Sequence, residues 1–277
     1  MLGALKPEVT ETEMKSSAKR ILTLIVVIPT LVSALGGILI PRIYDGLLPV
    51  DFLPGALPQD VITILVCVIL LGLTFSRYGD DLKANVILIG LYGSIWYLYG
   101  IVTIERVYNL LYLFYAASFA ASFWSLIYTL AAIDWKNLSC ELGIRIRRLT
   151  GISSMFIATL FTVLWILSLI PLMISHDRIE FLYSIYILDL CFVMPAFFML
   201  GVMALKGERA GILLTPAMMI LGFFVIFPLG LNEVAKGFSH QPFSTGTMVV
   251  SFGFSIYMLA LAVVQLRQMR IVVDGGE

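Results

Sequence analysis

The sequence predicts an all-α fold: a polytopic helical membrane protein with eight transmembrane helices. Three observations predict it. Hydrophobic residues make up 60% of the chain and charged residues only 13%, with a mean hydropathy of +0.99, whereas soluble domains carry about 25% charged residues. Eight apolar runs each approach or exceed the roughly 20 residues that a helical span needs. Finally, when the segments between these runs are assigned alternately to the two sides of a membrane, most Lys and Arg residues fall on one side.

Each run is expected to be a helix, because backbone groups in hydrocarbon must be satisfied within the segment and the alternation of a β-barrel is absent. The expected spans are 21–40, 57–75, 84–104, 107–133, 151–175, 181–205, 210–231 and 245–266.

The basic residues orient the chain, with fourteen on one side and four on the other. Because Lys and Arg are retained in the cytoplasm, we expect both termini there and the protein in the cell (cytoplasmic) membrane. The fourteen are Lys6, Lys15, Lys19, Arg20, Arg77, Lys83, Lys136, Arg145, Arg147, Arg148, Lys206, Arg209, Arg267 and Arg270, and the four are Arg42, Arg106, Arg178 and Lys236.

The chain aligns with itself at one offset of 129 residues, which predicts an internal repeat. At this offset Asp60 meets Asp189, Gly93 meets Gly222, and Arg77 meets Lys206. Four helices per unit is an even number, so the two units would be parallel and related by an axis along the membrane normal. The expected parts are a cytoplasmic segment 1–20, a first four-helix repeat 21–133, a cytoplasmic interfacial linker 134–150, a second repeat 151–266 and a cytoplasmic tail 267–277.

Several function classes find no support. Eighteen Lys and Arg balance eighteen Asp and Glu, so no basic excess indicates a nucleic-acid partner. The sequence lacks His-Glu-x-x-His and Gly-x4-Gly-Lys motifs, and it has no Cys-x-x-Cys pair. We therefore expect no cofactor and lean away from an enzyme, and no metal site is assigned.

Four local patterns carry a resemblance to a known family. They are Pro58-Gln59-Asp60, the pair Tyr97 and Tyr99, an aromatic run from Asn109 to Phe119, and Tyr186-x-x-Asp189 followed by Pro195. In these patterns the chain resembles a family of uncharacterised prokaryotic polytopic membrane proteins with about eight spans. The resemblance implies the fold and carries no activity.

Asp189 is the main candidate site residue, because an Asp within a span costs about 2.5–3.5 kcal/mol and is retained for a reason. Either it faces a cleft between the repeats and exchanges a proton or holds a cation, or it only hydrogen-bonds a Tyr or Asn across helices. Asp60, its repeat mate, either joins this cleft or caps the second helix. Tyr186, one turn before Asp189, belongs to the same candidate site.

Polar residues at the outer helix ends form a second candidate group: Glu105, Asn109, Asn232 and Glu233. They either line an acidic vestibule that concentrates cations or are ordinary solvated helix ends.

Tyrosines form two stripes at helical spacing, one ending at Tyr99 and one containing Tyr112. Facing inward they would bind an amine or a flat apolar ligand. Facing lipid they would form an aromatic belt.

The sequence therefore supports two functions. The first is a carrier or binder of a small cation, a proton or a cationic solute, in which Pro195 and Pro228 let helices bend. The second is a non-transporting sensor or accessory subunit that binds a lipid or hydrophobe. The lipid bilayer is the expected partner in both.

Overall fold

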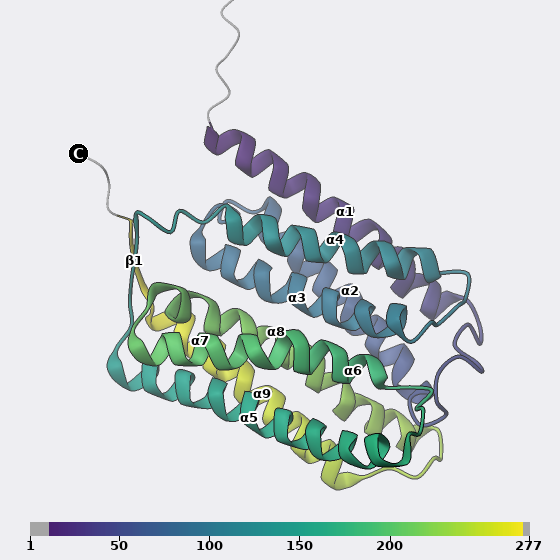
Figure 1. Ribbon diagram of the computed structural model, residues 1–277. Helices are drawn as coiled ribbons and strands as arrows, with labels where there is room; N and C mark the ends of the chain where they lie inside the picture. Colours follow the sequence, from purple (N-terminus) through teal and green to yellow (C-terminus); the bar gives the residue numbers. More distant parts are fainter. Residues whose placement is uncertain (1–10, 274–277) are drawn as a thin grey trace, which may run out of the picture.

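The computed structural model describes residues 11–273, and the side chains of residues 16–271. Long helices dominate this part of the chain, joined by short turns and one two-stranded sheet (Figure 1). In chain order the elements are α1 (Glu11–Leu39), α2 (Leu53–Phe75), α3 (Leu82–Ile104), α4 (Tyr112–Ala131), β1 (Leu138–Glu141), α5 (Ile144–Ser175), α6 (Tyr183–Leu188), the π-helical turn η1 (Asp189–Val193), α7 (Met194–Lys206), α8 (Arg209–Phe238), α9 (Thr245–Gln268) and β2 (Arg270–Val273).

The predicted fold class is confirmed. Eight helices in the described part are long and apolar enough to cross a bilayer, the sixth being the continuous run of α6, η1 and α7. Their outward faces carry large apolar side chains such as Ile28, Leu167 and Val250, which are 59%, 59% and 69% exposed. Such a surface suits lipid, and the protein is a multi-pass membrane protein in contact with the bilayer.

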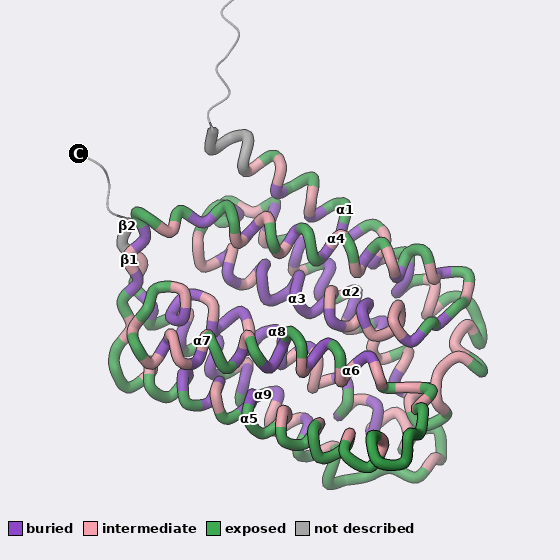
Figure 2. The backbone as a smooth tube through the Cα atoms, in the orientation of Figure 1, coloured by how far each residue is buried: buried purple, intermediate pink, exposed green. Residues whose placement is uncertain are grey.

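The first four spans lie together, and the last four lie beside them (Figure 1). Between these halves α3 packs against α8, and both helices are buried over most of their length (Figure 2). The approach is close at Gly90, where a Cβ atom would lie 2.8 Å from the backbone oxygen of Ala217. Small residues permit such contacts between membrane helices.

One end of the bundle is marked by the sheet, and we call it the sheet side. There β1 pairs antiparallel with β2, with Cys140 opposite Ile271. Residues 134–150 were expected to form a cytoplasmic interfacial linker, and the pairing of β1 with β2 was not predicted. In the structure α5 begins at Ile144, so the basic stretch around Arg147 forms its first turns.

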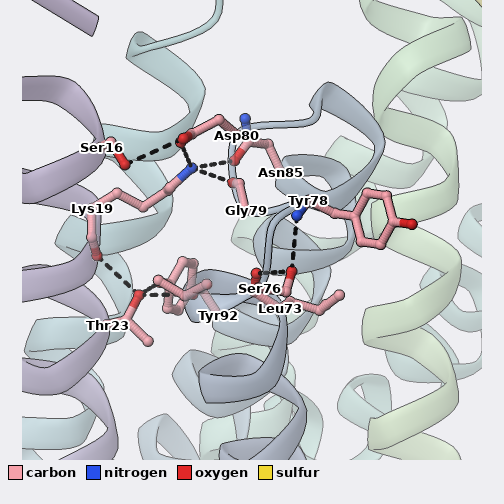
Figure 3. Close-up of polar contacts among 11 residues, drawn as sticks. Ser16, Lys19, Thr23, Leu73, Ser76, Tyr78, Gly79, Asp80, Asn85 and Tyr92 are labelled. Atoms are coloured by element: carbon pink, nitrogen blue, oxygen red, sulfur yellow. Dashed lines mark hydrogen bonds and ion pairs between the residues drawn. The ribbon is translucent and has the colours of Figure 1, made fainter. Parts of the chain in front are cut away.

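The start of α1 is tied to the turn between α2 and α3 on the sheet side (Figure 3). Lys19 lies within α1 and is only 7% exposed. Its ammonium donates to the Gly79 carbonyl, to Asp80 Oδ1 at 2.8 Å and to Asn85 Oδ1 at 3.3 Å. These bonds satisfy the buried charge, which would otherwise be costly.

The ion pair of Lys19 and Asp80 predicts a pH dependence. Hydrogen bonding from Lys19 lowers the pKa of Asp80 below its ordinary value, so the stabilisation is present at neutral pH and is lost as the pH falls through the lowered pKa. The Asp80 side chain is 59% exposed, so water screening keeps the contribution below about 1 kcal/mol. Thermal unfolding should show Asp80→Asn less stable than wild type at pH 6, with the gap closing towards pH 3. A gap that does not change with pH would contradict the assignment.

Candidate functional site

A central cavity of about 320 Å³ lies between the two halves. It occupies the part of the bundle away from the sheet, because it is lined there by the α1–α2 loop, the start of α2 and the ends of α3 and α8. Deeper residues come from α5, α7 and α9. The wall is mostly apolar, with few polar side chains: Gln59, Tyr97, Glu105, Trp165, Asp189 and Asn232. Its volume lies within the usual range for small-molecule sites.

Asp189 lies in the wall of this cavity and is only 5% exposed. Its Oδ2 accepts a 2.6 Å hydrogen bond from Trp165 Nε1 on α5, and the Tyr97 hydroxyl of α3 lies close to the same carboxylate. Helices from both halves therefore meet at this acid group.

A change in helical winding begins at Asp189. The N–H of Met194 donates to the Asp189 carbonyl, five residues back, and Pro195 follows in the first turn of α7. Proline has no N–H to donate and so disturbs the α-helical pattern. π-Turns of this kind occur frequently at functional sites, and this one begins at the acid that lines the cavity.

Asp60 is also buried, at 6% exposure, and it lies two turns inside α2. The alternative in which Asp60 caps this helix is wrong, since the N-cap position is Phe52. The Tyr44 hydroxyl donates to both carboxylate oxygens, at 3.2 and 3.0 Å. Burial, and then the Asp60 charge, raise the pKa of Tyr44 above its ordinary value, so the hydroxyl keeps its proton and remains a donor.

Asp60 and Asp189 line neighbouring cavities. Asp60 borders a smaller cavity of about 80 Å³, together with Tyr44, Tyr99 and Tyr115. Five residues border both cavities, which therefore adjoin: Leu48, Ala56, Gln59, Leu98 and Val102. The structure therefore places the two predicted carboxylates in two adjoining cavities and not in one shared cavity.

The candidate residues at the helix ends have different surroundings. Glu105 lies in the central cavity wall at the end of α3, and Asn232 lies there on α8. Glu233 instead bonds Lys236 at 2.7 Å and accepts from the Ser244 N–H at 2.7 Å. Asn109 donates to Tyr115 and accepts from the Leu111 N–H. These last two side chains hold loops and helix ends, and neither borders the central cavity.

The predicted tyrosines also lie in different surroundings. Tyr99 borders the smaller cavity and donates to the Thr30 carbonyl at 3.2 Å. Tyr112 donates to the Thr103 carbonyl and packs against Tyr108. Tyr186 stands edge-on to Trp165, with ring centroids 5.4 Å apart, and so supports the indole that holds Asp189.

Trp165, Tyr97 and Tyr44 contact the acids and were not among the candidates. Tyr97 had a signal in the sequence, because it belongs to the Tyr-rich end of the third span. Trp165 and Tyr44 had none, since each becomes a neighbour of its Asp only when separate segments pack.

The fold and this cavity define the class of protein, an integral membrane protein with eight spans among its described residues and an internal, acid-containing cavity. Comparison with known protein families, with curated proteins and with solved structures gave no match. Among residues 11–273, no three His, Cys, Asp or Glu side chains gather closely enough to hold a metal ion. The family resemblance and its motifs stay a prediction.

Proposed function

We propose that the protein is a membrane carrier that binds a small organic cation in the central cavity, with Asp189 as its counter-charge. The observation that carries the proposal is a buried carboxylate in the wall of a cavity of about 320 Å³ between the two halves. No Lys, Arg or His of the described chain lines this cavity. The cavity wall therefore gives the Asp189 carboxylate no positive partner, and a cation bound there would neutralise its charge. Tyr97, Phe161 and Trp165 add aromatic rings that favour organic cations.

The halves would move against each other during transport. The contact of α3 with α8 at the centre supports this, because these helices are the third members of the two proposed repeats. The π-turn at Asp189 and Pro228 in the cavity wall offer places where helices bend. The described members of the fourteen basic residues assigned to the cytoplasm belong to segments on the sheet side, so the cavity would lie in the outer half of the cell membrane and the termini in the cytoplasm.

One observation favours a second function. The cavity wall is mostly apolar, and both Asp60 and Asp189 already accept hydrogen bonds from the protein. A non-transporting sensor or accessory subunit that holds a lipid tail in this cavity would fit these features.

Uptake into proteoliposomes tests the carrier. The purified protein should accumulate members of a panel of labelled mono- and diamines above empty liposomes, and Asp189→Asn should lower that uptake by at least about tenfold, because the counter-charge is lost. Asp177→Asn is the matched control, since Asp177 is exposed in the turn after α5. Unchanged uptake in Asp189→Asn would overturn the carrier. A lipid recovered from the cavity, with no uptake by wild type, would support the sensor.

A further inference from the structure

Glu105 forms a second acidic point in the central cavity. It follows the last residue of α3 and is 7% exposed. Its Oε1 accepts from the Ser184 N–H at 2.9 Å and from the Ser184 hydroxyl at 2.5 Å. Its Oε2 is buried and has no hydrogen-bond partner within the described part of the chain. The next residue, Arg106, is exposed, with its guanidinium near the Tyr183 ring.

Asn232 lines the same cavity and also has a buried oxygen atom without a hydrogen-bond donor. It is 5% exposed, and its Nδ2 donates to the Asp51 carbonyl at 3.0 Å. Its Oδ1 is buried without a donor among the described residues. A Cβ at Gly55 would lie 2.5 Å from this oxygen, so glycine is needed for α2 to pass it. Buried acceptors are nearly always paired, and the described part of the chain supplies no donor to either oxygen. A ligand that brings donors would therefore satisfy both.

The two acids lie at different depths. Ser184, which holds Glu105, precedes Asp189 by five residues, and this separates the two levels by about 8 Å along the helix axis. The cavity wall includes the apolar side chains of Ile101 on α3 and Ile185 on α6. In the sequence, each of these residues lies between the positions that define the two levels. The cavity is thus acidic at two points and apolar between them.

We infer that the substrate is a linear aliphatic diamine, with one ammonium group at Asp189 and the other at Glu105 and Asn232. This inference rests on the proposed function and names its substrate class. The two positive charges match the two carboxylates, and each ammonium brings three donors to oxygens that have unused acceptor capacity. With carbon–carbon bonds of about 1.5 Å, a chain of about five carbons spans this separation.

Binding to the purified protein in detergent, measured by calorimetry, tests the inference. Pentanediamine should bind at least about tenfold more tightly than pentylamine, which has the same chain and one charge. Glu105→Gln should remove most of this advantage, because glutamine keeps the acceptor for Ser184 and loses the charge. Asp189→Asn should weaken the binding of both amines. Glu180→Gln, at an exposed position in the preceding turn, should change neither.

The outcomes separate the two proposals. If pentanediamine and pentylamine bound with equal affinity, and Asp189→Asn weakened both, the assignment of a diamine substrate would be overturned. The proposed function would still stand. Binding of neither amine, or binding insensitive to Asp189→Asn, would overturn the proposed function itself.

Binding of a series of diamines of different chain lengths to the wild-type protein tests the inference without a variant. Affinity should peak at about five carbons, with propanediamine and heptanediamine weaker by about tenfold or more. A steady rise with chain length would show apolar contact alone and would overturn the inference.

Discussion

Replacing Gly90 by leucine is expected to lower the free energy of unfolding by about 1–3 kcal/mol, because no room exists for a side chain there. A Cβ at this position would lie 2.8 Å from the Ala217 carbonyl oxygen and 2.8 Å from the Ile220 Cβ, both on α8. A backbone carbonyl within a helix cannot turn aside, so α3 and α8 would have to separate. This contact joins the two halves of the molecule. Unfolding of the protein in detergent, followed by far-ultraviolet circular dichroism, measures the loss.

Gly72→Leu is the matched control for Gly90→Leu. Gly72 lies within α2, and a Cβ there would meet no atom within 4 Å. Both variants replace a helical glycine by the same residue, so they share the gain in helix propensity and differ in the space available. If the two variants had equal stability, the close packing of α3 on α8 would be refuted.

The helices and the depth of Asp189 could be predicted from the sequence, because both follow from local composition. An apolar run of sufficient length predicts a span by itself, and an acid inside a span is costly wherever the other helices lie. The hydrogen bond from Trp165 could not be predicted. Tryptophan is common in membrane helices, and only the packing of α5 against η1 places this indole beside the carboxylate.

The ion pair of Glu233 had a signal in the sequence. Lys236 follows it by three residues, a spacing that places two side chains together on a helix, and the structure shows this ion pair at 2.7 Å. Pairing of β1 with β2 had no comparable signal, because it joins segments about 130 residues apart that are only four residues long. Local signals thus explain the site residues that were expected, and distant packing explains why Trp165 and Tyr44 were missed.

Asp60 and Asp189 match in sequence yet differ in surroundings. A Cβ at Gly37 of α1 would collide with the Asp60 carboxylate and the Tyr44 hydroxyl, so α1 passes directly over this acid. In the second half the neighbour of Asp189 is the indole of Trp165, and a larger cavity remains beside it. This difference favours Asp189 as the residue that meets a ligand and Asp60 as one that holds α1 and its loop.

Replacing Ala56 by tryptophan should abolish amine binding while leaving the protein folded. Ala56 borders both cavities, so an indole at this position would extend into space that a ligand needs, and the remaining volume would fall below the usual range for small-molecule sites. Calorimetry should show affinity for pentanediamine at least about a hundredfold weaker than in wild type. Ala117→Trp, on the exposed face of α4, introduces the same side chain towards lipid, where tryptophan is tolerated, and should bind as wild type does. If Ala56→Trp had a normal unfolding midpoint and still bound the amine, the amine would bind outside the central cavity. Asp189 would then not belong to the amine-binding site.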